Sequence, residues 1–240
     1  MIAALKSRFH REQFHPTWLG LFINPFYFAR KNLHAHVSEL AAKLGGKVLD
    51  VGCGTKPYLR YTKASEYIGL EIDSLDKRQH SKADFFYDGH DFPFQNTEFD
   101  AVITNQVLEH VFHPDYFLAE INRVLKPNSL LLLTVPFMWD EHEQPYDFGR
   151  YSSFGLMYLL KTHGFTPIEY RKSPPDFQAV AQLVTAYVYK ITPTSSRWAD
   201  ILRTFFLIAP INVFGALFAK ILPANQDLFL DNIVLAQKTS

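Results

Sequence analysis

A glycine-rich turn after a short apolar stretch is the feature of this sequence best suited to chemistry. Asp50 ends the stretch, and Gly52 and Gly54 follow it directly. Glycine has no Cβ, so it adopts positive φ values and lets a ligand lie against bare backbone. Glu71 and Asp73 follow about 20 residues later, the spacing of the ribose-binding carboxylate in nucleotide-binding βαβ units. Together these residues predict a site for a cofactor that contains a nucleoside.

The rest of the turn narrows the choice of cofactor. A dinucleotide site needs a third glycine at position 57, where the helix packs closely at the pyrophosphate. Pro57 occupies that position, and proline has no N–H to offer a phosphate. A nicotinamide-dependent oxidoreductase is therefore disfavoured. Residues 50–55, Asp-Val-Gly-Cys-Gly-Thr, instead resemble motif I of the class I S-adenosylmethionine-dependent methyltransferases.

Further segments carry the same resemblance in the family's order. Residues 67–73 resemble its second strand, which ends in the ribose-binding acid. The other matching segments are 88–94 with 98–103, 106–111, and 123–129 before a fifth strand. Five motifs over roughly residues 46–136 are far more specific than a lone glycine motif.

The resemblance implies that S-adenosylmethionine is the cofactor and suggests which residues contact it. The turn would pass the cofactor along its backbone, and Glu71 would bind the ribose hydroxyls. Asp88 would lie at the adenine edge, although Asp84 and Asp91 compete for that role. Tyr58 either caps the cofactor or packs in the core. The implied cofactor-binding residues are Asp50, Gly52, Cys53, Gly54, Glu71, Asp73, Asp88, Gly89, Asn105 and Gln106.

A polar, aromatic segment, residues 136–151, follows the expected fifth strand. It stands at the carboxyl end of a strand, where open α/β sheets bind substrates. It resembles the Pro-Phe-x4-His-x2-Pro-x-Asp-x2-Arg-Tyr stretch of methyltransferases associated with sugar or cell-envelope synthesis. His142 is the candidate general base, because the ordinary pKa of histidine lies near neutrality. Asp147 could orient it, and Arg150 either binds an anionic substrate group or pairs with Asp147. Anchoring the loop is the alternative role for all three.

The elements that position these residues follow from periodicity. Apolar residues at helical spacing predict a helix over 33–44, ended by Gly45 and Gly46. Strands are expected at 48–51, 67–72, 84–87, 99–104, 129–135, 165–170 and 232–237, and helices at 114–124 and 152–162. This alternation predicts an α/β fold, a Rossmann-like seven-stranded, mostly parallel sheet with helices on both faces. The resemblance implies an antiparallel last strand.

Four parts are predicted along the chain. They are a helical cap (1–45), the cofactor-binding Rossmann-like domain (46–172), an apolar helical insertion (173–225) and the final strand of the sheet (226–240). Within the insertion, 201–222 approaches the length of a membrane span, but Pro210 argues against a clean transmembrane helix. Residues 177–222 are thus expected either to pack in a core or homodimer, or to contact a membrane peripherally.

Composition limits the partners and the compartment. Lys plus Arg and Asp plus Glu both number 24, so the net charge is zero and no nucleic-acid partner is predicted. Cys53 is the only cysteine, which excludes an intrachain disulfide and favours a reducing compartment. It is expected to be a small buried filler rather than a nucleophile. No metal site is predicted, and a cytoplasmic location, at the inner face of the membrane if the insertion contacts lipid, is expected.

Together these observations predict an enzyme that methylates a small-molecule or glycan acceptor, on oxygen, by in-line displacement. The apolar insertion adds the hypothesis that the acceptor is lipid-linked. A catalytically silent partner protein that binds S-adenosylmethionine is the alternative, because the cofactor half of such a fold does not fix its activity.

Overall fold

A computed structural model describes residue 12 and residues 16–239. The chain forms two compact units. Of the described residues, the helical unit contains residue 12, residues 16–35 and residues 172–231, and the sheet unit contains residues 36–171 and 232–239. Described segments from the expected cap and from the expected insertion thus belong to one unit, and the four-part division stays a prediction.

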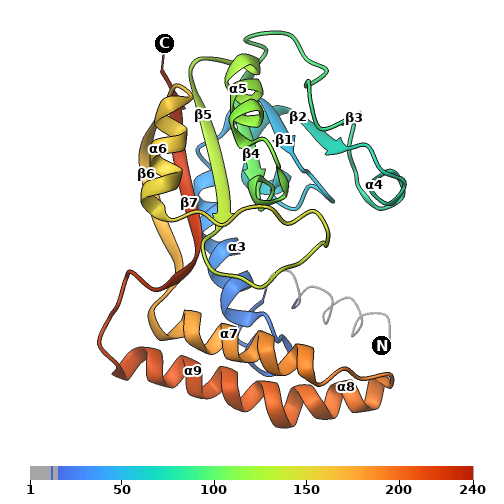
Figure 1. Ribbon diagram of the computed structural model, residues 1–240, viewed down its shortest axis with the longest axis vertical. Helices are drawn as coiled ribbons and strands as arrows, with labels where there is room; N and C mark the ends of the chain where they lie inside the picture. Colours follow the sequence, from blue (N-terminus) through green and yellow to red (C-terminus); the bar gives the residue numbers. More distant parts are fainter. Residues whose placement is uncertain (1–11, 13–15, 240) are drawn as a thin grey trace. The chain divides into compact units, whose positions relative to one another are not determined.

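A seven-stranded sheet carries the candidate site (Figure 1). Its strands, in spatial order, are β3 (Phe85–Tyr87), β2 (Lys63–Ile72), β1 (Gly45–Val51), β4 (Phe99–Asn105), β5 (Leu125–Pro136), β7 (Phe229–Lys238) and β6 (Phe165–Pro175). The pairs from β3 to β5 are parallel, whereas β7 runs antiparallel. The predicted Rossmann-like fold is confirmed.

Strand register brings the candidate residues to one edge. Val51 of β1 pairs with Leu70 of β2 and with Thr104 of β4. Asn105, at the end of β4, pairs with Thr134 of β5. The carboxyl ends of these four strands are therefore level, and the loops that follow them gather at the same edge of the sheet.

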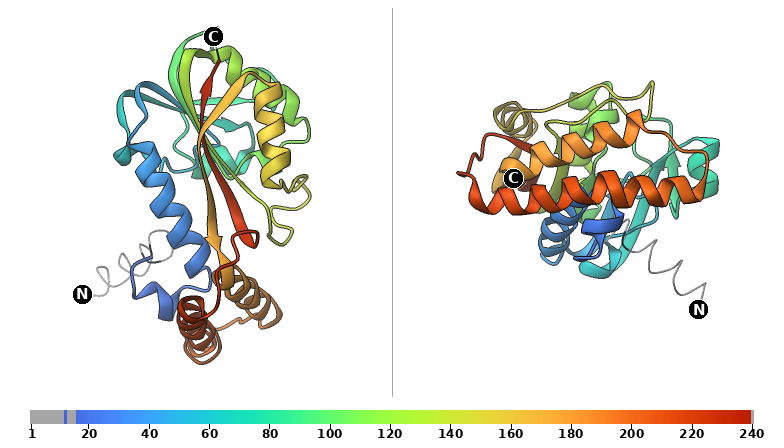
Figure 2. Two further views of the ribbon diagram at one scale, coloured as in Figure 1. Left: turned by 90° about the vertical axis from the view of Figure 1, so that its left-hand side faces the viewer. Right: turned by 90° about the horizontal axis from the view of Figure 1, so that it is seen from below.

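Helices cover both faces of the sheet (Figure 2). They are the end of α3 (Tyr27–Ala41), α4 (Leu75–His80), α5 (Pro114–Val124) and α6 (Ser153–Thr162), with short turns η1 (Leu59–Tyr61) and η2 (Leu108–His110). The helix α5 begins with proline, whose missing N–H costs nothing there, and buries Phe117, Leu118 and Ile121. The helix α3 ends at Ala41, whereas the two glycines expected to end it begin β1.

The helical unit is built around a pair of long helices. It contains α2 (Gly20–Ile23), α7 (Asp176–Ile191) and a continuous helical stretch made of α8 (Arg197–Arg203), the π-helical turn η3 (Thr204–Ile208) and α9 (Ala209–Ile221). The helices α7 and α9 lie side by side (Figure 2). On α7, Gln182 and Thr185 are buried, and Gln178 accepts a hydrogen bond from Asn32 at 3.1 Å. These polar side chains of α7 therefore face the inside of this unit.

Among the described residues, one helix is long and apolar enough to cross a membrane by length and composition. It runs over the 24 residues Trp198–Ile221, and an 18-residue window within it has a mean hydropathy of 1.8 and is only 28% buried. The core helix of a water-soluble protein would be mostly buried, so the exposure of this helix needs a physical explanation.

Candidate functional site

The glycine turn after β1 combines tight packing with open backbone. Gly52 has φ +72°, and a Cβ added to it would come within 2.3 Å of the Val107 side chain. Gly54 has φ +48°, but a Cβ there would meet nothing within 4 Å. Gly52 is therefore required by the approach of the loop after β4, whereas Gly54 presents bare backbone to open space, as a ligand cradle requires.

Glu71 lies beside that open backbone. The residue is 5% exposed, and Oε2 accepts a hydrogen bond from the Gly54 amide at 3.0 Å. This bond fixes the end of β2 against the turn, with an acceptor that suits a vicinal diol. Asp73 instead forms a two-pronged ion pair with Arg78 at 2.6 and 2.8 Å, so its carboxylate is already engaged.

Asp50 is a buried acid at the end of β1, just before the turn. Its side chain is buried and accepts a hydrogen bond from the Tyr67 hydroxyl at 2.7 Å. Burial raises the pKa of Asp50 to about 7, against the opposing effect of the Tyr67 hydrogen bond. Burial also raises the pKa of Tyr67, which keeps that hydroxyl protonated as the donor.

Cys53 and Tyr58 take packing positions. Both side chains are buried. Burial, with the nearby carboxylates Asp50 and Glu71, raises the pKa of the Cys53 thiol to about 12. A thiol that stays protonated is a poor nucleophile, so the filler role expected from the sequence agrees with this environment.

Three acids compete for the adenine edge, and their contacts differ. Asp84 accepts from the Gly69 amide at 2.7 Å and pairs with Lys56 at 2.5 Å. Asp91 accepts a hydrogen bond from the Tyr116 hydroxyl. Asp88 is exposed, accepts a hydrogen bond from the His90 amide two residues along the chain at 3.0 Å, and precedes a glycine at φ +93°. Asp88 therefore makes the most local of these contacts, and its adenine role stays a prediction.

The loop after β4 is tied to β5. Asn105 Oδ1 accepts from the Thr134 hydroxyl at 2.9 Å. The Gln106 backbone amide donates to the Thr134 carbonyl at 3.1 Å, and the Gln106 backbone has φ +56°. Both residues therefore lie where strand ends meet, in the position that the resemblance gives to methionine-binding residues.

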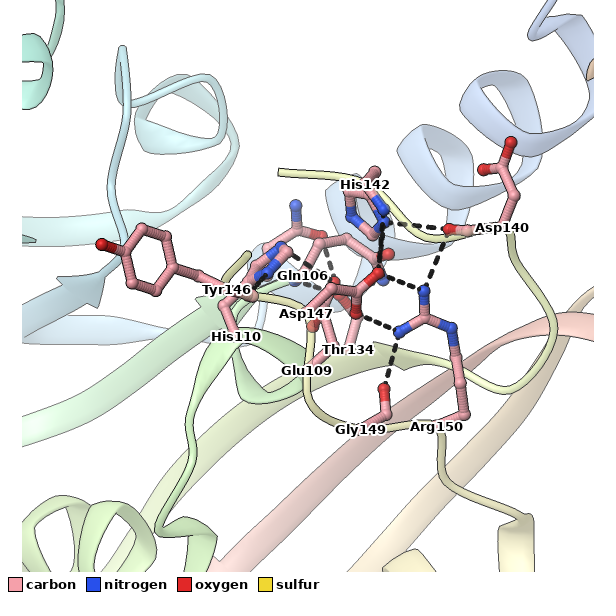
Figure 3. Close-up of polar contacts among 11 residues, drawn as sticks. Gln106, Glu109, His110, Thr134, Asp140, His142, Tyr146, Asp147, Gly149 and Arg150 are labelled. Carbon is pink, nitrogen blue, oxygen red and sulfur yellow. Dashed lines mark hydrogen bonds and ion pairs between the residues drawn. The ribbon is translucent and has the colours of Figure 1, made fainter. Parts of the chain in front are cut away.

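Asp147 is the hub of the segment after β5 (Figure 3). Its two carboxylate oxygens bind Arg150 at 2.5 and 2.7 Å, and Oδ2 accepts from the His142 amide at 2.9 Å. The hydrogen bond from Arg150, the largest cause, lowers the pKa of Asp147 to about 2. Arg150 also binds the carbonyls of Gly149 and Asp140. Of its two expected roles, the structure contains the pairing with Asp147, and anion binding stays a prediction.

This network defines the tautomer of His142. Nδ1 of His142 lies 3.2 Å from both the Asp140 carbonyl oxygen and Asp147 Oδ2. Because both of these atoms are acceptors, we assign the proton to Nδ1. The lone pair is then on Nε2, the arrangement of a general base held by a carboxylate.

The structure adds Glu109 and His110, of which the sequence singled out neither for the site. Glu109 is fully buried, and the two imidazole rings of His110 and His142 meet edge-on with centroids 4.9 Å apart. Nδ1 of His110 donates to the Tyr146 carbonyl at 2.6 Å, so Nε2 holds its lone pair. One ligand atom from each of Glu109, His110 and His142 lies within 4.8 Å of the others, close enough to hold a metal ion. The signal was the Glu-His pair directly after β4.

Taken together, the turn fits a nucleoside cofactor, because open backbone at Gly54 adjoins the buried carboxylate of Glu71. The loops after β4 and β5 add the imidazole of His142, whose lone pair on Nε2 could accept a proton. In the described sheet unit, the turn after β1 and the His142 network together form the candidate active site at this edge of the sheet.

Part of this chain is similar in sequence to known methyltransferases. A family model described as a methyltransferase domain matches residues 26–169. A fatty-acid O-methyltransferase of Mycolicibacterium smegmatis is 36% identical over 112 residues, 41% of this chain and 40% of that protein. A demethylmenaquinone methyltransferase of Staphylococcus saprophyticus is 34% identical over 111 residues, 40% of this chain and 47% of that protein. The matched segments span less than half of each relative.

Solved structures share the fold. Phosphoethanolamine N-methyltransferase 2 of Haemonchus contortus, in complex with S-adenosylhomocysteine, aligns with a TM-score of 0.56 at 16% identity, over 92% of this chain and 56% of that chain. The [4+2]-cyclase SpnF aligns with a TM-score of 0.52 at 22% identity, over 85% and 80% of the two chains. The names of these two proteins describe different reactions, so at this identity the likeness concerns the fold alone.

Proposed function

The chain belongs to the class I S-adenosylmethionine-dependent methyltransferase family, and from that premise we propose that it methylates a hydroxyl oxygen of a small lipid-linked acceptor. The observation that carries the proposal is the His142–Asp147 pair at the carboxyl edge of the sheet, which leaves the imidazole lone pair on Nε2. The fatty acid and the menaquinone named for two relatives support an apolar acceptor.

The cofactor side of the proposal rests on the turn after β1. When bound, S-adenosylmethionine supplies a methyl group on a positively charged sulfur. Glu71 would accept hydrogen bonds from the ribose hydroxyls, and the open backbone at Gly54 would lie along the ligand. Family members contact the methionine part after the fourth strand, so Asn105 and Gln106 are the proposed residues there.

On the acceptor side, His142 Nε2 would take the hydroxyl proton as the oxygen gains its methyl group. Asp147 stays ionised because of Arg150, so it can stabilise the imidazolium that results. Arg150 holds Asp147 in place through two contacts. A carboxylate acceptor has no proton to lose and does not need this pair, whereas a hydroxyl acceptor does.

We propose further that the enzyme works at the cytoplasmic face of a membrane, with the helical unit making the peripheral contact. A lipid-linked acceptor stays in the bilayer, and an enzyme that meets it there must lie on that surface. The exposed, apolar helix Trp198–Ile221 supports this location. A homodimer built through the same helices is the alternative use of that surface.

The test is transfer of labelled methyl groups from S-adenosylmethionine to a panel of acceptors in lipid vesicles. The panel contains a fatty acid, a quinol and a hydroxylated glycolipid. We expect labelled glycolipid, and we expect His142→Gln to lower kcat by about 10²- to 10³-fold while the Kd for S-adenosylhomocysteine stays within about twofold, as befits a base that acts only in the transition state. His80→Gln, a change of an exposed histidine on α4, is the matched control.

Two outcomes would contradict the proposal. Equal rates of methyl transfer by wild type and His142→Gln would show that His142 is not the general base. Tight binding of S-adenosylhomocysteine without transfer to any acceptor would favour a silent partner protein.

A further inference from the structure

The helical stretch α8–α9 carries many of its large apolar side chains on the outside. Along α8, η3 and α9, every exposed residue between 201 and 219 is apolar. Five large side chains in this range, and Trp198 just before it, are each 50% or more exposed. They are Trp198, Leu202, Phe205, Phe206, Phe214 and Leu217. We call these six residues the α9 face. In water, folding buries such side chains, so a face of this kind marks contact with another apolar phase.

Small and polar residues lie on the inward-facing side of α9. The Asn212 amide donates to the Leu21 and Asn24 carbonyls, both at 3.0 Å. A Cβ on Gly215 would lie 2.5 Å from the Ala181 Cβ, so α9 and α7 approach closely there. This side of α9 is therefore tied along its length to other parts of the helical unit, and only the opposite side is available to a partner.

Charge is placed at the borders of the α9 face. Arg203 is buried and forms an ion pair with Asp200, and it also donates to the Thr192 carbonyl at 2.8 Å. Its charge is therefore turned away from the face. Lys190 and Lys220, at the ends of α7 and α9, are exposed. An uncharged aromatic surface, on a pair of helices with an exposed lysine in the last turn of each, complements an anionic bilayer.

We propose that the α9 face docks on an anionic lipid bilayer, with α8 and α9 lying in the plane of the interface. This inference deepens the proposed function, and its use for catalysis rests on that function. A second copy of the chain is the weaker occupant, because a protein interface has a polar rim with hydrogen bonds and the exposed positions between 201 and 219 offer no polar side chain. A spanning orientation would carry into lipid the helices α2 and α7, to which Asn212 and Gly215 hold α9.

The experiment is flotation of the purified full-length protein with vesicles, without detergent. One set of vesicles is phosphatidylcholine, and the other contains phosphatidylglycerol as well. We expect the protein to float with both, and several-fold more strongly with the anionic set. Phe205→Ser with Phe214→Ser should weaken partitioning by at least about tenfold, because each change removes an aromatic ring from the apolar phase. Lys190→Gln with Lys220→Gln should remove this several-fold anionic preference.

Phe154→Ser is the matched control, because Phe154 on α6 is 86% exposed but belongs to the sheet unit. It should float like wild type. Each variant must also retain the wild-type melting temperature and affinity for S-adenosylhomocysteine, and any that does not is replaced by the milder Phe205→Ala or Phe214→Ala.

Three results would overturn the proposal. The first is no flotation with either vesicle set, together with a dimer by light scattering that the phenylalanine changes dissociate. The second is equal flotation of wild type and the double phenylalanine variant. The third is protein that alkaline carbonate cannot release from vesicles, which indicates a spanning helix. Methylation of a soluble, short-chain acceptor would persist in the first two cases if the proposed function holds, so the two failures are distinguishable.

Discussion

The sheet unit and the helical unit treat apolar and polar side chains in opposite ways. In the sheet unit, leucine, valine and phenylalanine fill the core between sheet and helices, and charged groups such as Asp147 and Glu71 bind defined partners near the strand ends. In the helical unit, Asn212 and Gln182 are fully buried, whereas Phe206 and Phe214 are more than half exposed. One unit has the pattern of a domain folded in water, and the other the pattern of a surface that meets a second apolar phase.

Near residue 170, the boundary between these patterns lies close to the end of the family match. The match to the methyltransferase domain ends at residue 169, before α7 begins at Asp176. The residues common to the family therefore prepare a cofactor site, and residues 176–221, which follow the matched segment, provide the exposed apolar helices. We infer a division of labour in which the sheet unit does the chemistry and the helical unit selects where the acceptor is met.

The largest effect should come from removing the ribose acid. Glu71→Ala deletes the partner of the Gly54 amide and the proposed acceptor for two hydroxyls, so we expect the Kd for S-adenosylhomocysteine to rise about 100-fold. Calorimetric titration measures this change. Asp73→Ala, whose carboxylate is engaged by Arg78, should cost less, and the reverse ranking would exchange the two roles.

A second change probes the packing of the helical unit. Gly215→Ala forces a Cβ to within 2.5 Å of Ala181, so we expect a loss of about 1–3 kcal/mol in the free energy of unfolding. Gly155→Ala on α6 makes only an ordinary contact at 3.4 Å and should be neutral or stabilising by about 0.5 kcal/mol. Denaturant unfolding compares them, and equal effects would mean that α7 and α9 do not pack as described.

A smaller effect concerns pH and the buried Asp50. Burial raises the pKa of its carboxyl group to about 7, above the ordinary value of about 4, so the folded state holds a proton that the unfolded state has lost. The free energy of unfolding should therefore fall as the pH rises from about 4 to 7, and stay lower above that. Asp50→Asn should flatten this slope in thermal melts, and an unchanged slope would assign the pH dependence elsewhere.

The smallest expected change is the effect of a chelator. Glu109, His110 and His142 could hold a metal ion, but the proposed role of His142 is that of a base. The rate of methyl transfer should therefore be the same, within about twofold, after dialysis against EDTA. If EDTA abolishes activity and Mg²⁺ or Zn²⁺ restores it, Glu109, His110 and His142 would instead be metal ligands.

The sheet unit was largely predictable because its signals are local. Glycines at 52 and 54, an acid about 20 residues on and alternating strands and helices all depend on short-range backbone preferences. The expected helix α5, residues 114–124, agrees with the structure. The boundary at Gly45 and Gly46 did not, because these glycines could equally end a helix or begin a strand.

The candidate site was harder to predict where it depends on distant contacts. The pairing of Arg150 with Asp147, three residues apart, was among the expected roles. Nothing in the local sequence indicates that the ring of His110 meets that of His142 from another loop. The apolar insertion had the same limit. Its composition allowed a core, a dimer or a membrane surface, and only the exposure of residues such as Phe206 in the structure favours the last.

The division of labour is tested most directly by the methyl-transfer rate of one variant on two forms of the acceptor. Phe205→Ser with Phe214→Ser would be compared with wild type on a soluble short-chain acceptor and on the same headgroup anchored in anionic vesicles. The account predicts an unchanged kcat/KM on the soluble acceptor and a loss of about tenfold or more on the anchored one. An equal loss on both acceptors, or no loss on either, would contradict it.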